Sequence, residues 1–504
     1  MLTRALVLLL ALVLFPAAPA AAMDPALFKA LTVLKENADQ VRKDLGVPGV
    51  AVAVVQGDQV VFKQCWGVSD IRTNAPVDEN TVFQIASISK SFTATLAAME
   101  MAAGRLSSQD KVVSRLPDFK LYDPQATAAF TVEDLMAHRS GLPPCAGDHQ
   151  LLFGKRRDEL AHALRYIPLQ NPFRSAYAYQ NVPFIEAGYI VEQTSKMTWE
   201  QNLYKRLFVP LGMEHASADL PGFLNSKNRA ALHQMQSGKP AALPDDWPWM
   251  GVAYVVGPAG GINASLNDMI PYLILHMNHG RYNGAQIVDA AALDDLHRPR
   301  TPLPGGILGN KASYCQGFIW EDCGNYRLIW HNGGSPGHKS ILIFDPDANL
   351  GMVALSNLLD TNLPEYLTTF LFRIYHNQRS ASALVQDIRK QAQASRQPAS
   401  RPAAPAGVKA SRPLADYVGD YTNPAYGTLH VTTDGNTLKV ALGNVAVRFP
   451  LAPRDAADTF WLELPYVDDD ASGTALFYTD RNDKVQGVVL EKFKETDPPV
   501  FTRD

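Results

Sequence analysis

The chain has 504 residues but few cysteines, little imbalance of charge and only one long apolar run. Four cysteines are few for an exported chain of this length, and none has the spacing of zinc ligands (Cys65, Cys145, Cys315 and Cys323). No block of basic residues could follow a phosphate backbone, so we do not expect a nucleic acid as a partner. We also predict no metal site and no cofactor.

The one long apolar run lies at the N-terminus. Residues 1–22 contain a single arginine, an apolar stretch from Ala5 to Phe15, and three closing alanines, which is the layout of a secretory signal peptide. The stretch is shorter than the ~20 residues of a membrane span. We therefore predict cleavage near Ala22, a periplasmic or secreted product, and no membrane span afterwards. The mature chain would have 45 basic and 50 acidic residues, a formal charge of −5.

Residues 23–391 are predicted to form one large α/β domain. A helical pattern at 25–45 precedes two apolar strands joined by a turn at residues 56–58, and four extended runs at 314–322, 326–334, 339–346 and 349–357 precede an amphipathic helix at 363–391. Helical patterns and Pro/Gly-rich loops fill the middle. Strands at both ends predict that the two ends share one sheet, which the helical insert covers.

The rest of the chain is predicted to be a linker and a second domain. Residues 392–413 are rich in Ala, Pro, Ser and Arg and poor in large apolar side chains, which is typical of a solvated linker. Residues 414–504 contain short alternating runs separated by turns such as Asp434-Gly435-Asn436. This pattern predicts a small antiparallel β-barrel or sandwich.

A serine and a lysine lie three residues apart where a buried helix is predicted to begin. Ser87 and Lys90, in the stretch Phe83–Met101, would share one helix face, which brings the amine within reach of the hydroxyl. A buried lysine kept neutral can activate a serine as a nucleophile. The same spacing recurs in the polar stretch around Ser108 and Lys111, and helix starts are often rich in serine, so the pattern needs support from elsewhere in the chain.

Two motifs further along the chain provide that support. Tyr179-Gln180-Asn181 precedes a helical pattern, and His331-Asn332-Gly333-Gly334 ends an apolar strand. The order SxxK, YxN and a basic residue with glycines at a strand end resembles the serine β-lactamase and penicillin-binding superfamily. The chain is most similar to the class C β-lactamase, D-aminopeptidase and family VIII esterase branch (peptidase family S12). Residues 138–143 and 259–269 resemble loop motifs of that branch, and the tail resembles its lipocalin-like domain.

The resemblance implies a β-lactamase-like antiparallel sheet flanked by helices, a small C-terminal barrel, and a role for each motif residue. Ser87 would attack a carbonyl group and form an acyl-enzyme, and Lys90 or Tyr179 would be the base. Tyr179 would protonate the leaving group, and the nearby ammonium predicts a lowered phenol pKa. The substrate and its oxyanion would be bound by the remaining motif residues, namely Asn181, His331, Gly333 and Gly334.

His331 is the main departure from the family pattern. The classical β-lactamases and carboxypeptidases of this superfamily have lysine there, a permanent cation at pH 7, whereas histidine has an ordinary pKa of about 6.5. Its pull on a substrate carboxylate would be weaker. The sequence therefore predicts poor β-lactam hydrolysis and better turnover of esters, amides or D-residue peptides.

Three functions follow from this pattern. The first is an exported serine hydrolase of the esterase or D-peptidase type, acting on a small molecule or peptide that can derive from the cell wall. The second is a β-lactamase or DD-carboxypeptidase proper. The third is a catalytically idle protein that binds cell-wall fragments, which the intact set of Ser87, Lys90 and Tyr179 argues against. The sequence does not indicate an oligomeric state.

Overall fold

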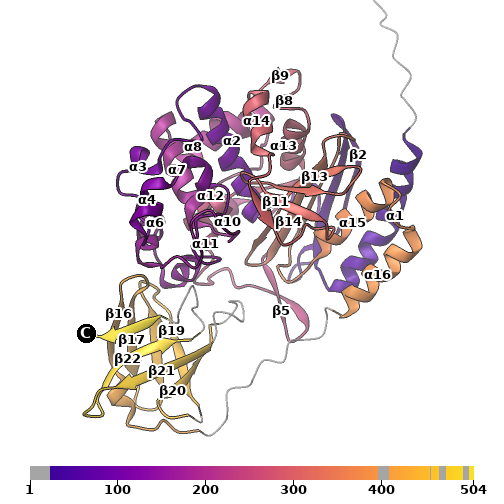
Figure 1. The fold of residues 1–504 in the computed structure, drawn as a ribbon. Coiled ribbons are helices and arrows are strands. Elements are labelled where there is room, and N and C mark those ends of the chain that lie inside the picture. The colour runs from indigo at the N-terminus through magenta and orange to yellow at the C-terminus, as the bar shows by residue number, and fades with distance from the viewer. Residues whose placement is uncertain (1–22, 395–407, 455, 465–472, 492–498) are drawn as a thin grey trace, which may run out of the picture.

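The structure is a computed structural model that describes residues 23–394, 408–454, 456–464, 473–491 and 499–504 (Figure 1). The predicted signal peptide, residues 1–22, and residues 395–407 of the predicted linker lie outside the described residues. Within the described ranges, no helix is both long and apolar enough to cross a membrane.

A nine-stranded antiparallel sheet forms the centre of the first domain. Its strand order is β10-β11-β12-β13-β14-β15-β1-β2-β3. Because β1 pairs with both β2 and β15, the two ends of the domain share one sheet, as the sequence predicts. The strands are β1 (Gly49–Gln56), β2 (Gln59–Asp70), β3 (Ala75–Pro76), β10 (Thr301–Leu303), β11 (Lys311–Tyr314), β12 (Ile319–Asp322), β13 (Arg327–Ser335), β14 (His338–Asp345) and β15 (Leu350–Ser356).

Helices cover both faces of this sheet (Figure 1). The terminal helices α1 (Pro25–Leu45), α15 (Leu363–Tyr375) and α16 (Ala381–Ala394) pack on the face that β1 lines with Val50, Val52 and Val54. Successive strand residues point to opposite faces, so Ala51, Ala53 and Val55 belong to the second core, under the helical insert. The sheet is thus the middle layer of an α/β domain.

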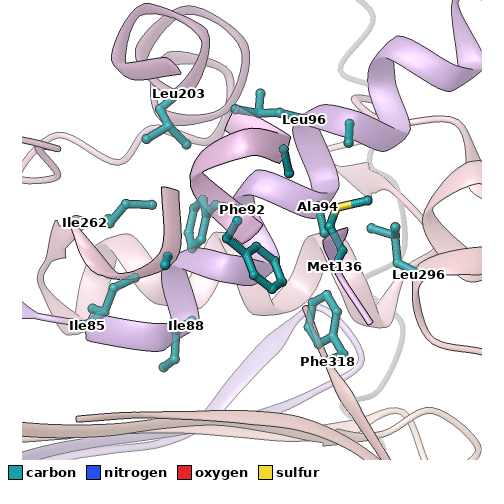
Figure 2. Packing of buried hydrophobic residues seen from close by; sticks show 14 of the residues in the cluster. Ile85, Ile88, Phe92, Ala94, Leu96, Met136, Leu203, Ile262, Leu296 and Phe318 are labelled. Carbon is teal, nitrogen blue, oxygen red and sulfur yellow. The ribbon is translucent and has the colours of Figure 1, made fainter. Parts of the chain in front are cut away.

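The helical insert is built around α2 (Ser89–Ala102), which is buried on nearly all sides. Ile88, Phe92 and Leu96 pack against apolar side chains from several other segments (Figure 2). A helix buried all round is fixed by tertiary packing, so its first turn is held rigidly.

The other helices of the insert range from 3 to 14 residues in length. They are α3 (Val112–Arg115), α4 (Pro124–Ala129), α5 (Val132–Leu135), α6 (Arg157–Ala163), α7 (Val182–Ser195), α8 (Trp199–Leu203), α9 (Val209–Leu211), α10 (Leu220–Asn225), α11 (Val252–Val255), α12 (Gly257–Gly260), α13 (Leu266–Met277) and α14 (Ala290–Leu296). Small hairpins pair β5 (His233–Gln236) with β6 (Lys239–Ala242) and β8 (Arg281–Tyr282) with β9 (Ala285–Gln286), and a short two-stranded sheet pairs β4 (Phe83–Gln84) with the distant β7 (Asn263–Ala264).

Two predicted elements are divided in the structure. The run 314–322 is a hairpin between β11 and β12, because Gly317 takes a φ of 73° and lies against the backbone of Lys90, where a Cβ would come within 2.7 Å of the carbonyl oxygen. The predicted helix 363–391 is two helices, since Asn377 has a left-handed φ of 54° that ends the first.

The C-terminal region is a closed eight-stranded antiparallel barrel. Its strands follow chain order, and β16 closes the barrel against β23. Tyr417, Phe460 and Phe477 meet edge to face in its core. The strands are β16 (Gly419–Asn423), β17 (Gly427–Thr433), β18 (Leu438–Leu442), β19 (Arg448–Pro453), β20 (Thr459–Leu462), β21 (Gly473–Thr479), β22 (Val485–Leu490) and β23 (Val500–Arg503).

Candidate active site

Ser87 lies in a tight turn immediately before α2. A 3-10 turn spans Ala86–Ile88, and Ala86 has a left-handed φ of 49°, which is costly for a residue other than glycine. Ala86 and Ile88 are buried, whereas Ser87 is partly exposed. The turn therefore presents the serine hydroxyl outward from an otherwise buried, rigid segment.

Lys90 follows in the first turn of α2 and is fully buried. Its Nζ lies 3.0 Å from Ser87 Oγ, 2.6 Å from Asn181 Oδ1 and 3.0 Å from the carbonyl oxygen of Ala259. The helix thus brings the amine to the serine, as the spacing predicts. Ala259 belongs to α12 and to the stretch 259–269 that resembles a family loop motif.

The environment of Lys90 favours its neutral form. Burial lowers the pKa of the Lys90 ammonium to about 7, although the negative charge of Asp148 acts in the opposite direction. A lysine with this pKa is largely a free amine slightly above neutral pH. It can then accept a proton.

Tyr179 and Asn181 lie just before α7 and face the same serine. The Tyr179 hydroxyl is 2.6 Å from Ser87 Oγ, and Lys90 Nζ lies 4.7 Å from the centre of the phenol ring. The predicted lowering of the phenol pKa is wrong: burial raises the pKa of Tyr179 well above its usual range. Tyr179 is therefore a proton donor in the resting site, and the amine is the stronger candidate for the base.

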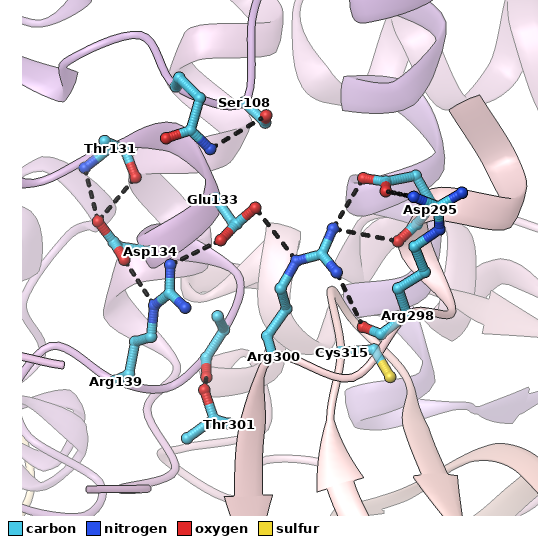
Figure 3. Close-up of polar contacts among 12 residues, drawn as sticks. Ser108, Thr131, Glu133, Asp134, Arg139, Asp295, Arg298, Arg300, Thr301 and Cys315 are labelled. Carbon is cyan, nitrogen blue, oxygen red and sulfur yellow. Dashed lines mark hydrogen bonds and ion pairs between the residues drawn. The ribbon is translucent and has the colours of Figure 1, made fainter. Parts of the chain in front are cut away.

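The loop that contains His138 supports Tyr179 from behind. The His138 ring lies 4.5 Å from the Tyr179 ring and 4.1 Å from the Tyr314 ring. Ion pairs hold the adjacent residue, since Arg139 contacts both Glu133 and Asp134 at 2.6 Å (Figure 3). This network fixes the loop and, through His138, the position of the phenol ring.

His331 is buried in the middle of β13, which continues through the glycines to Ser335 instead of ending at the histidine. Its Nε2 is 3.0 Å from the Tyr314 hydroxyl and its Nδ1 is 2.5 Å from the carbonyl oxygen of Asn332. Burial, with a smaller contribution from the charge of Lys90, lowers the pKa of the His331 imidazole to about 3. The ring is therefore neutral at pH 7.

Gly333 and Gly334 take different positions at the end of the same strand. A Cβ on Gly333 would overlap the carbonyl oxygen of Ile85 and would lie 3.1 Å from the backbone nitrogen of Ser87. Gly334 is exposed, and a Cβ there would meet a single side-chain atom, Leu359 Cδ1, at 3.1 Å. The missing side chain at Gly333 thus allows β13 to approach the serine turn closely.

Asp148 is a site residue that the sequence analysis did not identify. Its Oδ2 accepts a hydrogen bond of 2.7 Å from Asn181 Nδ2. Burial raises the pKa of the Asp148 carboxyl to about 6, against the opposing effects of Asn181, Lys90 and Cys145. No motif or periodicity marks this aspartate at the start of a short 3-10 helix, so only the three-dimensional arrangement reveals the contact.

The site is built from protein groups that suit covalent catalysis. A serine with an amine and a phenol within hydrogen-bonding distance has the arrangement of an activated nucleophile. Across the residues that the structure describes, no group of three His, Cys, Asp or Glu side chains is arranged to hold a metal ion.

Comparisons with known proteins agree with this arrangement. A family model described as "Beta-lactamase" matches residues 34–376, and a second, described as "Domain of unknown function (DUF3471)", matches residues 403–503. Penicillin-binding protein 4 of Amycolatopsis lactamdurans is 28% identical over 335 residues, which cover 64% of this chain and 84% of that protein.

Solved structures resemble the fold at low identity. The octameric penicillin-binding protein homologue from Pyrococcus abyssi has a TM-score of 0.61 and 20% identity, covering 94% of this chain and 100% of that one. The D-amino acid amidase from Ochrobactrum anthropi SV3 has a TM-score of 0.57 and 21% identity, covering 70% and 100%. A family model matches well over half of the length of this chain, and its sheet, helices and serine site are of the expected kind. This chain therefore belongs to the beta-lactamase family.

Proposed function

We propose that this chain is an exported serine hydrolase that forms an acyl-enzyme at Ser87 and cleaves ester, amide or D-residue peptide bonds. The observation that carries the proposal is the meeting of Lys90 and Tyr179 at Ser87 Oγ, at 3.0 and 2.6 Å. Within the family, the motif order supports a relation to the D-aminopeptidase and esterase branch that resembles class C β-lactamases.

Acylation begins with transfer of the Ser87 hydroxyl proton to the neutral amine of Lys90. The serine oxygen then bonds to the substrate carbonyl carbon, and the carbonyl oxygen becomes an oxyanion. Collapse of this intermediate breaks the bond to the leaving group, which takes a proton from Tyr179. Tyr179 regains a proton from Lys90, so both groups return to their starting states.

Deacylation repeats these steps with water in place of serine. Lys90 takes one proton from the attacking water, whose oxygen bonds to the acyl carbon, and the acyl group leaves as a carboxylic acid while Lys90 returns the proton to Ser87. Asn181 contributes by holding the Lys90 amine and by offering its amide to the substrate.

The oxyanion would be bound by two backbone N–H groups, those of Ser87 and Gly334. The close approach of Gly333 to the Ser87 nitrogen supports this arrangement, because it brings the end of β13 beside the serine turn. Removal of one such donor typically costs about 3 kcal/mol of transition-state stabilisation.

The neutral state of His331 supports a preference for substrates other than β-lactams. A β-lactam antibiotic carries a carboxylate that a cation would attract, and His331 is buried, engaged by Tyr314 and uncharged at pH 7. An ester, an amide or a peptide with a D-residue does not require that cation for binding. We therefore propose that such substrates, including fragments of the cell wall, are turned over faster than β-lactams.

A panel of substrates tests this proposal. Chromogenic esters, D-amino-acid anilides and the cephalosporin nitrocefin would be compared by kcat/KM for the wild-type protein and for Ser87→Ala. We expect the highest kcat/KM for an ester or a D-residue substrate and no turnover by the variant. Nitrocefin hydrolysis faster than that of every other substrate would favour a β-lactamase proper, and binding without turnover would favour an idle binder.

Export is a separate part of the proposal. Cell fractionation and N-terminal sequencing of the mature protein test it directly. We expect a periplasmic or secreted chain that begins near Met23, immediately before the first described helix at Pro25. A full-length chain retained in the cytoplasm would contradict export but would leave the proposed chemistry intact.

A further inference from the structure

We infer that Asp148 is a positioning residue for Lys90, acting through Asn181, and that the C-terminal barrel holds the segment that contains it. This inference rests on the proposed function, because it concerns how the same serine is activated. It gives the barrel a role in the reaction of the first domain.

The first step is the orientation of the Asn181 amide. A carboxylate can only accept hydrogen bonds, so the contact of 2.7 Å with Asp148 Oδ2 requires the Asn181 amide nitrogen on that side. The amide oxygen must then face Lys90 Nζ, at 2.6 Å. Asp148 therefore decides which end of the Asn181 side chain the lysine meets.

The second step is the direction of the amine lone pair. A neutral Lys90 amine has two N–H bonds and one lone pair, and two of its three neighbours are pure acceptors, namely Asn181 Oδ1 and the Ala259 carbonyl oxygen. Both N–H bonds are used by these acceptors. The lone pair is left for the hydroxyl proton of Ser87, at 3.0 Å. A reversed Asn181 amide would remove one acceptor and disturb this arrangement.

The charge of Asp148 has a second effect on the same amine. The titratable groups that face Lys90 come from four segments other than its own helix. The Asp148 carboxylate raises the pKa of Lys90, opposing the effect of burial. Removal of that charge would therefore keep Lys90 neutral at a lower pH. The titratable groups that face Lys90 are Asp148 and Cys145 before α6, His138 after α5, Tyr179 before α7 and His331 on β13.

The third step is the attachment of the segment to the barrel. Asp148 begins a 3-10 helix, Asp148–Phe153, and Phe153 ends it inside the apolar cluster of the barrel. The Phe153 ring lies parallel to that of Phe501 at 5.9 Å and edge to face with that of Tyr426 at 5.4 Å. The Phe153 carbonyl oxygen accepts a hydrogen bond of 3.0 Å from the backbone of Asn444.

Two more contacts fix the same end of the segment. The Trp249 indole donates a hydrogen bond of 3.1 Å to the carbonyl oxygen of Leu152 and stacks on Phe449 of β19 at 5.3 Å. Lys155 Nζ donates to the carbonyl oxygen of Ala425, between β16 and β17. The end of the helix that is far from Asp148 is therefore anchored to the barrel by both backbone and ring contacts.

The segment between these contacts is short enough to move as one unit. Glycines with left-handed φ flank it, Gly147 at 92° and Gly154 at 68°, and these mark its two ends as turns. Only four residues separate Asp148 from Phe153. A shift of the barrel contact would therefore reach Asp148, and a displacement of about 1 Å in catalytic geometry can cost ~100-fold in rate.

Two substitutions of Asp148 separate its acceptor from its charge. Asp148→Asn keeps an oxygen that can face Asn181, so we expect kcat within ~10-fold of wild type and an acid limb of kcat/KM about one pH unit lower. Asp148→Ala removes both, so we expect a fall in kcat of ~100-fold with little change in KM. A wild-type pH profile and kcat in both variants would overturn the role of Asp148.

Two matched substitutions in the barrel test the attachment. Phe449→Leu weakens the stack on Trp249, whereas Phe477→Leu makes the same change elsewhere in the barrel core. We expect faster amide hydrogen exchange at residues 148–153 and a fall in kcat of ~10-fold for Phe449→Leu alone. Equal kcat in the two variants would overturn the role of the barrel.

Two further measurements make the results of these tests interpretable. Trp249→Phe keeps a ring that can face Phe449 but removes the hydrogen bond to Leu152 and part of the indole, so it tests the attachment if Phe449→Leu fails to fold. Labelling of Ser87 by a fluorophosphonate in the wild-type protein, mapped by mass spectrometry, separates the two proposals. Labelled wild type with unaffected variants contradicts this inference alone, whereas unlabelled wild type contradicts the proposed function and the inference together.

Discussion

The chain contains the same four-residue pattern at Ser87–Lys90 and at Ser108–Lys111, and the two copies have different surroundings. Lys90 is fully buried on α2 with three polar neighbours, whereas Lys111 is exposed and donates to the carbonyl oxygen of Ala129. Ser108 lies between α2 and α3, where Gln109 Nε2 approaches its hydroxyl at 3.5 Å. The second copy is part of a polar surface loop.

The comparison shows which properties make the serine in this pattern reactive. Spacing alone places an amine near a hydroxyl, but burial removes the proton from the amine, and a second donor orients the hydroxyl. Ser87 has both a buried amine and the Tyr179 phenol within 3.0 Å. Substitutions at Ser87 and Lys90 can therefore be compared with the same substitutions at Ser108 and Lys111, which serve as matched controls.

Replacement of the nucleophile has the largest expected effect. Ser87→Ala removes the oxygen that forms the acyl-enzyme, so kcat/KM for any substrate that wild type turns over should fall by a factor on the order of 10⁴ or more. Ser108→Ala serves as the matched control and should retain wild-type kcat/KM. Comparable losses in both variants, measured with the same chromogenic ester, would contradict the assignment.

Replacement of the amine should have the next largest effect. Lys90→Met keeps an unbranched apolar side chain in the buried space but removes the proton acceptor, and general-base catalysis typically contributes 10²- to 10⁴-fold, so we expect a loss of ~10³-fold in kcat. Lys111→Met changes an exposed side chain in the surface loop. Its kcat should equal that of wild type, and retained activity in Lys90→Met would remove the lysine from the mechanism.

Alanine substitutions should have different effects at the two glycines of β13, Gly333 and Gly334. Gly333→Ala forces the new Cβ against the Ile85 carbonyl oxygen, so the strand must move away from Ser87, and we expect a ~100-fold loss in kcat/KM. Gly334→Ala meets only the end of a leucine side chain and should cost less. The opposite order of losses, at unchanged thermal stability, would contradict the close approach of Gly333.

A change of pH should have the smallest expected effect on the kcat/KM of the wild-type protein. Lys90 must be neutral to act as a base, so kcat/KM should rise with pH through its pKa of about 7 and then level off. The raised pKa of the Tyr179 phenol keeps that group a proton donor across the same range. A fall in kcat/KM between pH 6 and 8 would indicate that a protonated lysine is required instead.

Much of the fold and the central residues could be predicted from the sequence. The strand and helix patterns at residues 25–67 and 326–357 follow from hydrophobic periodicity, and they correspond to α1, β1, β2, β13, β14 and β15. Capping boxes begin α8 at Thr198 and α13 at Ser265, and the spacing of each serine or threonine from the Gln or Asp three residues later is visible in the sequence. The serine, lysine and tyrosine were identified because each lies in a short motif at the start or end of an element.

Other features depend on contacts between distant segments and could not be predicted. Asp148 begins a short 3-10 helix that no hydrophobic periodicity marks, and its role follows from one hydrogen bond to Asn181. The pKa of Tyr179 was predicted in the wrong direction, because the sequence shows the neighbouring lysine but not the extent of burial. The hairpin at Gly317 likewise exists because that residue packs on the backbone of Lys90.

One labelling experiment tests the central claim, which is that Lys90 makes Ser87 a nucleophile and that the copy at Ser108 is inert. A fluorophosphonate probe would be applied to wild type and to Lys90→Met at pH 8, and the adduct mapped by mass spectrometry. The account predicts one adduct at Ser87 in wild type, none at Ser108, and labelling at least ~10²-fold slower in the variant. An adduct at Ser108, or equal labelling rates in the two proteins, would contradict it.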